Sequence, residues 1–253
     1  MKISIITATY NCENLIDKTL TSIENQDFKN IECIIIDGKS EDNTLQKIEK
    51  YKNRIKNIVI ISELDNGLYE AMNKGLRLAT GDIIAILNAG DYYTTNNILS
   101  LVATQFIKKT NLEALYGDLE YINDKEKVVR YWKSGVFNIK KIYRGWIPPH
   151  PTFFVRNDVY KKYGYFNEDL EISADYELML RFLLKHKITT TYISKVIVKM
   201  PIGGKSNASL KNRIQAHLED RLSWKENNLQ PKFYTVTLKP LSKIVQFFNK
   251  KRK

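Results

Sequence analysis

The sequence predicts an α/β protein with a mostly parallel central sheet and helices on both faces. Short apolar stretches alternate with helical stretches through Leu87, in the order βαβαβαβ, and the loops between them are short. The apolar stretches carry β-branched residues on both faces, as is typical of strands buried between two helical layers. Because crossovers in such units are right-handed, we expect a doubly wound sheet.

The first half of the chain supplies the regular part of this pattern. We expect strands over residues 2–9, 31–36, 58–62 and 83–87. Helices are expected over 13–26, from 40–44 onward and over 68–79. The first and last of these helices carry apolar residues at helical spacing, namely Leu15, Ile16, Leu20 and Ile23, and Leu68, Met72, Leu76 and Ala79.

The second half is less regular. We expect helices over 98–108, 158–163, 174–185 and 210–225. Strands are expected over 113–122, 127–132, 152–155, 189–194 and 196–200. We divide the chain into one α/β domain over 1–205, with halves 1–95 and 96–205, and a C-terminal helical extension over 206–253.

Composition places the chain among soluble globular proteins, with 43% hydrophobic and 27% charged residues out of 253. No apolar run has the length of a membrane-spanning helix, and the N-terminus does not resemble a signal peptide, so we expect a cytoplasmic protein. Cys12 and Cys33 are too few for a zinc knuckle or a disulfide framework, and we expect both in the core.

The net charge of +12 requires a partner, and nucleic acid, an anionic membrane and anionic substrates all fit. From Lys239 to Lys253 there are six basic and no acidic residues. Four apolar residues at helical spacing lie among them: Leu241, Ile244, Val245 and Phe248. Such a segment is typical of a peripheral membrane contact at the inner face of the cytoplasmic membrane. A helix packed on its own domain, with a frayed basic end, fits equally well.

Polar and glycine residues follow three of the expected strands. Thr7, Ala8 and Tyr10 lie at the end of the first, Asp37 and Gly38 at the end of the second, and Asp65-Asn66-Gly67 after the third. Open α/β sheets bind ligands at the carboxyl ends of their strands. Asp37 could therefore accept hydrogen bonds from a nucleobase or ribose, although an Asp-Gly turn alone also explains it.

Two nucleotide motifs are missing. No G-x-G-x-x-G follows the first strand, so the sequence does not indicate a dinucleotide cofactor. Gly203-Gly204-Lys205-Ser206 is similar to a phosphate-binding loop, but the position of its first glycine is Lys199. We therefore reject a P-loop.

Two further sites could carry chemistry. Asn88 and Asp91 end the fourth strand and offer oxygen ligands to a divalent cation, or simply form a turn. Asp175 shares a helical stripe with apolar residues and lies in a first turn, where the helix dipole favours the ionised carboxylate that a general base needs. An ordinary first-turn acid behind Ser173 as a cap is the alternative.

Several stretches together resemble family 2 glycosyltransferases of the bacterial cell-surface polysaccharide type. They are SIITATYN, IIIDGKSEDNT, DNGLYEAMNKGLRLATGDIIAILNAGD and PHPTFFVRNDVYKKYGYFNEDLEISADYELMLRF, and the resemblance covers residues 1–205. It implies a GT-A (Rossmann-like) fold and inverting transfer from a nucleotide-diphosphate sugar, most often a UDP-sugar, to a saccharide or lipid-linked acceptor. Mg2+ or Mn2+ is the usual cofactor.

The resemblance also implies roles for individual residues. The nucleotide would be bound by residues of the first half, namely Thr7, Ala8, Tyr10, Asp37, Asp65, Lys74 and Asn88. Residues 88–91 occupy the place of the Asp-x-Asp metal motif, whose third position is Gly90 here, which leaves Asp91 as the metal ligand. Asp175 matches the catalytic base.

Acceptor contacts are expected from His150, in a Pro-Pro-His-Pro segment, and from Trp146. A proline-stiffened turn explains the histidine equally well, and core packing explains the tryptophan.

Two other functions stay open. A sugar-phosphate nucleotidyltransferase would carry a glycine-rich basic loop after the first strand, where this chain has TATYNCE. A non-catalytic basic module binding lipid or nucleic acid would explain the charge alone. Nucleic acid is disfavoured because Asp37, Asp91 and Asp175 would oppose phosphate binding.

Overall fold

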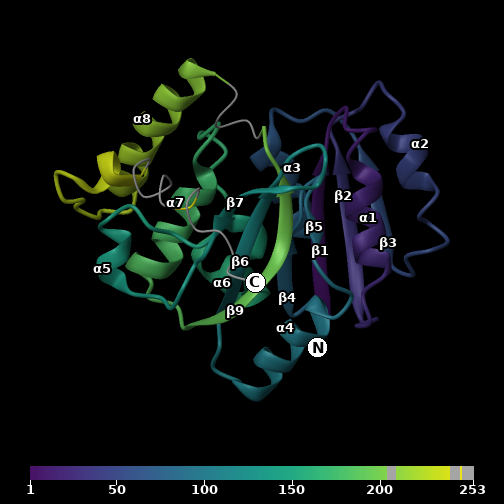
Figure 1. Ribbon diagram of the computed structural model, residues 1–253, viewed down its shortest axis with the longest axis horizontal. Helices are drawn as coiled ribbons and strands as arrows, with labels where there is room; N and C mark the ends of the chain where they lie inside the picture. Colours follow the sequence, from purple (N-terminus) through teal and green to yellow (C-terminus); the bar gives the residue numbers. More distant parts are fainter. Residues whose placement is uncertain (204–208, 240–245, 247–253) are drawn as a thin grey trace.

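The computed structural model describes residues 1–203, 209–239 and 246. Most of the predicted basic tail over 239–253 and most of the rejected phosphate loop over 203–206 therefore lie outside the described residues. The described chain folds around one large sheet (Figure 1). The N-terminal strands with α1 and α2 lie at one side of the molecule, and α7 and α8 lie at the other.

The sheet has the order β3-β2-β1-β4-β8-β6-β9-β5, and β7 pairs with β6. Its strands are β1 (Ile3–Thr9), β2 (Ile31–Asp37), β3 (Ile58–Ser62), β4 (Ile83–Ile86), β5 (Tyr92–Tyr93), β6 (Ala114–Ile122), β7 (Val128–Trp132), β8 (Phe154–Arg156) and β9 (Thr190–Pro201). The first four positions in the order are joined by parallel pairs. Beyond β4 the sheet is mixed, with β6 and β9 parallel and the other pairs antiparallel. The predicted α/β class is confirmed.

Helices cover both faces of the sheet. They are α1 (Ile16–Glu24), α2 (Thr44–Glu49), α3 (Leu68–Leu78), α4 (Ile98–Lys108), α5 (Ile139–Ile142), α6 (Asn157–Tyr163), α7 (Ala174–Leu180) and α8 (Leu210–Glu226). One apolar core lies between the sheet and α1, α2 and α4. The other lies between the sheet and α3, α6, α7 and α8. β1 contributes side chains to both cores, because Ile3 and Ile5 belong to one core while Ile6 and Ala8 belong to the other.

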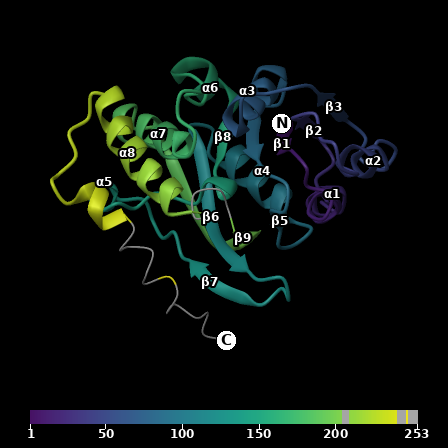
Figure 2. The ribbon, with the colours of Figure 1, turned by 90° about the horizontal axis from the view of Figure 1, so that it is seen from above.

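The helices and strands expected in the first half are present with ends shifted by a few residues. Cys12 and Cys33 are free and buried in the core beneath α1, as predicted. In the second half, the predicted helix over 98–108 and the pair of strands over 113–122 and 127–132 are also confirmed. Figure 2 shows β7 running beside the far end of β6.

Two predictions in the second half were wrong in detail. The strands expected over 189–194 and 196–200 form the single strand β9, because a bulge around Lys195 interrupts the pairing with β6 without ending the strand. The helix expected over 174–185 is α-helical only to Leu180 and continues as a π-helical turn, Arg181–Lys185. There the Arg181 guanidinium donates to the carbonyl oxygens of Tyr163 and Tyr165, which fixes the turn to the preceding loop.

α8 packs directly on α7, and both figures show the two helices side by side. Trp224 of α8 is fully buried, and its indole nitrogen donates to the Tyr176 hydroxyl of α7 at 3.0 Å. Within the described ranges, no helix combines the length and hydropathy that crossing a membrane requires.

Candidate active site

The carboxyl ends of β1, β2 and β4 meet at one edge of the sheet, because these strands are parallel neighbours. Thr7 is buried there, and its hydroxyl donates to the Leu87 carbonyl oxygen at 2.8 Å, tying β1 to the end of β4. Thr9 pairs with Asp37 across β1 and β2, and its hydroxyl donates to the Asp37 carboxylate at 3.0 Å. Three of the residues predicted to bind the nucleotide thus lie buried at this edge of the sheet: Thr7, Ala8 and Asp37.

Asp37 is fully buried and bonded to the protein itself. Its two carboxylate oxygens accept hydrogen bonds from the Thr9 hydroxyl, the Ser40 amide and hydroxyl and the Ser62 hydroxyl. A carboxylate with this many donors holds the loops that follow β2 and β3. The sequence did not single out Ser40 or Ser62, although each lies within three residues of a strand end.

Tyr10, which is exposed, and Asp65, which is half-buried, form the outer part of the edge. The Tyr10 ring is 64% exposed. A Cβ added at Gly38 would lie 2.7 Å from Asp65 Oδ2 and 3.4 Å from the Tyr10 ring, so both side chains close over this glycine. Any side chain at position 38 would displace the carboxylate. The Asp-Gly pair is therefore required for the shape of this corner.

Lys74 supports the same corner from α3. Its ammonium group donates to the Leu64 carbonyl oxygen at 2.9 Å and pairs with Glu63 at 2.9 Å and Glu70 at 3.2 Å. These contacts brace the loop that carries Asp65, and the carboxylates of Glu63 and Glu70 raise the pKa of Lys74. Lys74 lies beside the predicted nucleotide edge, with its charge directed to the loop.

The segment after β4 offers unusual oxygen atoms. Asn88 Oδ1 is buried and accepts no hydrogen bond from the described residues. The Asp91 side chain is 4% exposed, and burial raises its pKa to about 8. The Thr19 hydroxyl shapes this turn by accepting from the Gly90 amide at 2.9 Å and donating to the Asp91 carbonyl oxygen at 2.8 Å.

These atoms fit a divalent cation of the hard type. A buried carboxylate is costly unless it is neutralised or paired, and an orphaned amide oxygen needs an electropositive partner. Mg2+ and Mn2+ accept such oxygen ligands and take the remainder from substrate phosphates. Among the described residues no three acidic, histidine or cysteine side chains gather into a metal cluster, so the protein would supply only part of the coordination shell.

Asp175 lies at the start of α7 and is its least buried residue. From Ser173 to Leu180 every other residue is buried, whereas Asp175 is half-buried. Ser173 occupies the N-cap position, but its hydroxyl donates to the Ala216 carbonyl oxygen of α8 and makes no cap bond. The Asp175 carboxylate accepts the Tyr176 amide at 2.8 Å, which agrees with the alternative of an ordinary first-turn acid, and the side chain remains partly exposed.

The backbone before Asp175 is held from two sides. The Tyr69 hydroxyl of α3 donates to the Ile172 carbonyl oxygen at 2.7 Å. From α8, the buried carboxylate of Glu219 accepts the amides of Glu171, Ile172 and Ser173 at 3.1, 2.9 and 2.7 Å. Neither Tyr69 nor Glu219 was predicted, because both act over long distances in the sequence.

The charges of Asp91 and Asp175 both act on Tyr121 of β6. Burial raises the pKa of Tyr121, and these two charges raise it further against the effect of Arg130. Burial lowers the pKa of His150, and the Asp175 charge acts against that shift.

The two predicted acceptor-side rings are both packed in the protein. His150 is 9% exposed and contacts Phe166 edge-on at 5.4 Å between centroids. The Trp146 indole donates to the Ser134 carbonyl oxygen at 3.0 Å and packs on Tyr116 and Phe137. Core packing thus accounts for the contacts of Trp146.

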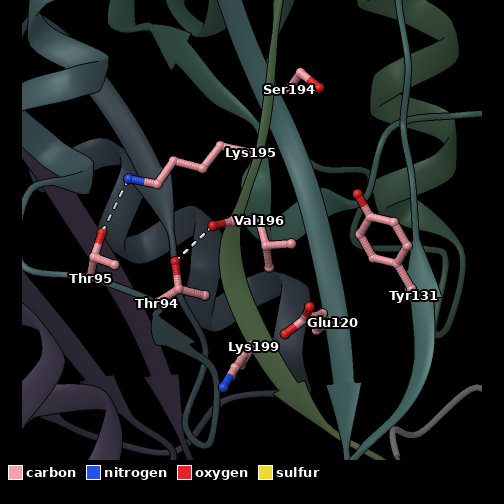
Figure 3. Close-up of a pocket in the computed structure, with 8 residues that line it drawn as sticks. All are labelled: Thr94, Thr95, Glu120, Tyr131, Ser194, Lys195, Val196 and Lys199. Atoms are coloured by element: carbon pink, nitrogen blue, oxygen red, sulfur yellow. Dashed lines mark hydrogen bonds between the residues drawn. The ribbon is translucent and has the colours of Figure 1, made fainter. Parts of the chain in front are cut away.

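A pocket of about 370 Å3 lies between β6, β7, β9 and the segment after β5 (Figure 3). It is lined by Thr94, Thr95, Glu120, Tyr131, Ser194, Lys195, Val196 and Lys199. Lys195 donates to Thr95 at 3.5 Å, and the Thr94 hydroxyl donates to the Val196 carbonyl oxygen at 2.7 Å. None of the predicted site residues lines this pocket.

The model of the family described as "Glycosyl transferase family 2" matches residues 4–173. The chain belongs to this family. The match spans β1 to the loop before α7 and includes Tyr10, Asp37, Asp65 and Asp91. Asp175 lies two residues beyond it. The predicted base therefore lies on α7, outside the matched range.

One relative of this chain is named as a glycosyltransferase, the "PGL/p-HBAD biosynthesis glycosyltransferase" of Mycobacterium tuberculosis. It is 26% identical over 206 residues, which cover 81% of this chain and 78% of the relative.

Two solved structures share the GT-A glycosyltransferase fold of this family 2 enzyme. The structure of S. aureus TarS 1-349 in complex with UDP-GlcNAc has a TM-score of 0.71 at 23% identity and covers 91% of this chain and 68% of its own. The mannosyltransferase PcManGT from Pyrobaculum calidifontis, in complex with GDP-Man and Mn2+, has a TM-score of 0.67 at 17% identity and covers 94% and 68%. In another TarS structure this chain spans 44% of the length.

Proposed function

We propose that this enzyme is an inverting glycosyltransferase that moves a sugar from a nucleotide-diphosphate donor, a UDP-sugar, to a saccharide or lipid-linked saccharide in surface polysaccharide synthesis. The observation that carries the proposal is that the partly exposed Asp175 carboxylate begins α7, while the buried Asp91 carboxylate follows β4 together with the buried Asn88 Oδ1. Displacement at an anomeric carbon needs two such groups, a general base for the acceptor hydroxyl and a carboxylate that binds a metal ion at the leaving diphosphate.

The donor nucleotide is assigned to the edge formed by β1, β2 and the loop after β3. Tyr10 offers an exposed ring on which a planar base can stack, and Asp65 offers a carboxylate to base or ribose hydrogens. Thr7, Ala8 and Asp37 support this corner from below, and Lys74 supports it from α3. The TarS complex with UDP-GlcNAc supports a UDP-sugar as donor.

The diphosphate is assigned to the turn after β4. Asn88 and Asp91 would hold a divalent cation there, and the complex of PcManGT with Mn2+ supports this assignment. When bound, the cation supplies Lewis-acid stabilisation of the charge on the leaving diphosphate.

Asp175 acts as the base in a single displacement. Its carboxylate accepts the proton of an acceptor hydroxyl while that oxygen bonds to the anomeric carbon. The bond from this carbon to the diphosphate oxygen breaks, the nucleoside diphosphate leaves, and the configuration inverts. His150 lies on the acceptor side of Asp175, where burial favours its neutral form by lowering its pKa.

The test is turnover with a panel of nucleotide sugars, followed by release of nucleoside diphosphate with and without saccharide acceptors. Asp175→Asn should lower turnover on the order of a hundredfold or more, because the proton acceptor is lost while the shape is kept. The matched control is Asp169→Asn, an exposed acid of the same loop. Near-normal transfer by D175N would refute the assignment of Asp175 as the general base. Release of pyrophosphate would instead indicate the nucleotidyltransferase.

We also infer that the enzyme works at the inner face of the cytoplasmic membrane, where lipid-linked acceptors lie. The basic residues of 239–253 support this through their composition. Lys239 itself pairs with Asp220 at 2.5 Å and lies over the Tyr176 ring at 3.6 Å, so the membrane contact is assigned to the residues that follow it. Deleting residues 240–253 should weaken binding to anionic vesicles.

A further inference from the structure

α8 buries two acidic side chains and a serine against the rest of the protein. Glu219, Asp220 and Ser223 are 3%, 5% and 0% exposed. Glu219 binds the loop before α7, Asp220 pairs with Lys239, and the Ser223 hydroxyl donates to the Glu219 carbonyl oxygen. Trp224 is the buried apolar residue of this inner face. A surface helix of a globular protein normally shows the opposite arrangement.

The outer face of α8 carries an apolar stripe. Residues spaced by four lie on one side of a helix, and four such residues are exposed here. They are Leu210 (73%), Ile214 (56%), Leu218 (55%) and Leu222 (39%). In Figures 1 and 2, α8 lies at the outer edge of the molecule, with α7 on its inner side. Burial in the core therefore does not explain why these positions are apolar.

Basic residues share this outer face. Lys211, Arg221 and Lys225 are all exposed. At about 100° per residue, Arg221 and Lys225 project between the members of the apolar stripe. The single exposed acid of α8, which is described over its whole length, is Glu226 at its last position, and it accepts a hydrogen bond from Asn167 at 2.9 Å. The outer face is thus apolar and cationic.

We propose that the outer face of α8 docks on an anionic lipid bilayer, with the helix lying in the plane of the interface. Exposed leucine and isoleucine side chains can enter the region between headgroups and acyl chains, while the long side chains of the lysines and arginine beside them extend to the headgroup phosphates. Each basic residue near an anionic surface adds to the attraction. A helix of 17 residues spans about 26 Å, enough to engage several headgroups at once.

The positive charge of this face favours an anionic bilayer over a second copy of this chain as its binding partner. Two copies meeting through the same face would bring three basic residues of each, Lys211, Arg221 and Lys225, against those of the other, without acidic partners on that face. The net charge of +12 acts in the same direction over longer range. This surface lies outside the predicted tail, so it would be a second membrane contact of the chain.

The test is co-sedimentation of the full chain with vesicles of phosphatidylcholine, alone or mixed with phosphatidylglycerol. We expect binding only to the anionic vesicles, weakening at high salt. The double variant Ile214→Gln/Leu218→Gln should bind them roughly tenfold more weakly, because two apolar side chains no longer enter the interface. Ile107→Gln on α4, where Ile107 is 61% exposed, is the matched control and should bind like the parent.

The same measurement is repeated after deleting residues 240–253. Loss of binding in I214Q/L218Q with the tail intact supports docking through α8. The proposal is overturned if that variant binds like the parent, or if light scattering shows that the parent is a dimer which the double variant dissociates. Vesicle binding needs no turnover, so failure of the glycosyltransferase assignment would not affect this readout, and unchanged melting temperatures exclude unfolding.

Discussion

Two buried carboxylates at the carboxyl edge of the sheet have opposite surroundings. Asp37 receives donors from Thr9, Ser40 and Ser62, which stabilise its charge and fix the loops around it. The Asp91 carboxylate is buried and receives no such donors from the part of the chain that the structure describes, and burial raises its pKa. A carboxylate of the first kind holds structure, whereas one of the second kind becomes favourable when a cation arrives.

Cation binding at Asp91 should therefore depend on pH. Burial raises the pKa of Asp91 to about 8, so a cation must displace a proton at neutral pH. Mn2+ affinity should increase as pH rises from 6 toward 8 and level off above it. Titration of chelator-treated protein with Mn2+, in the presence of nucleoside diphosphate, measures this.

Asp91→Asn should weaken Mn2+ binding roughly tenfold or more, because the amide lacks the charge that the cation needs. Asp158→Asn, at an exposed acid of α6, is the control and should bind Mn2+ like the parent. Full transferase activity after exhaustive chelation would contradict a metal at this turn.

The buried Glu32 carboxylate should make the stability of the fold depend on pH. Burial would raise its pKa, but hydrogen bonds from Lys2, Ser4 and Thr80 outweigh burial and lower it from 4.5 to about 2. Since the folded pKa is the lower one, this stabilisation is present above pH 4.5 and is lost as pH falls toward 2.

Glu32→Gln should accordingly lower the free energy of unfolding at pH 7 on the order of 2 kcal/mol, and much less near pH 2. Urea unfolding at both pH values measures the difference. Glu49→Gln, which removes an exposed pair with Lys52, should change stability by less than about 1 kcal/mol. An equal effect of E32Q at both pH values would refute the linkage.

Among residues, sequence patterns identified those whose type is unusual at a strand or helix end. Tyr10, Asp65, Asp91 and Asp175 could be found in this way because each follows or begins a regular element. Their partners could not. Tyr121 is one aromatic residue in a buried strand, and nothing in its spacing indicates that the charges of Asp91 and Asp175 act on it.

At the scale of elements, α7 is positioned by its neighbours more than by its own cap. The loop before it lies between the Tyr69 hydroxyl and the Glu219 carboxylate. Helical periodicity predicted α7 itself, but α8 buries Glu219 and exposes leucines. Sequence reasoning based on apolar faces therefore could not orient α8 or recognise Glu219.

Glu219 should act on catalysis through Asp175. In Glu219→Gln the charge that binds three consecutive amides is lost, and the loop before Asp175 should loosen. We expect kcat to fall roughly tenfold while KM for the donor stays nearly constant, since Tyr10 and Asp65 are unaffected.

Steady-state kinetics at several pH values measures this effect, and Glu226→Gln at an exposed position of the same helix is the control. A parent-like kcat in E219Q would exclude the positioning role. An equal loss of donor binding would indicate general unfolding instead.

At the scale of the whole molecule, the parallel half was predictable and the mixed half was not. β1, β2 and β3 follow one another as neighbours, and the crossover from β3 places β4 on the other side of β1, as expected for a doubly wound sheet. Beyond β4 the chain inserts β8 between β4 and β6 and brings β9 and β5 together from distant segments. Such pairings leave no periodic mark on the sequence.

The same long-range packing bears on the predicted division at residue 205. α8 contributes Trp224, which is fully buried with the aromatic rings of Tyr143 and Tyr176, to the core that supports Asp175. If residues 206–253 formed a detachable extension, removing this contact would leave the rest of the domain intact.

We expect instead that Trp224→Ala lowers the free energy of unfolding by about 3–5 kcal/mol, through lost burial and an unfilled cavity. The melting transition should stay single, because α7 and α8 unfold together with the sheet. Phe233→Ala removes an aromatic side chain of the same C-terminal segment that is 97% exposed, and it should change stability by less than about 0.5 kcal/mol. Denaturant unfolding and calorimetry of both variants decide the matter. A second, independent transition in the parent, or a parent-like W224A, would show that the C-terminal segment folds separately from the glycosyltransferase domain.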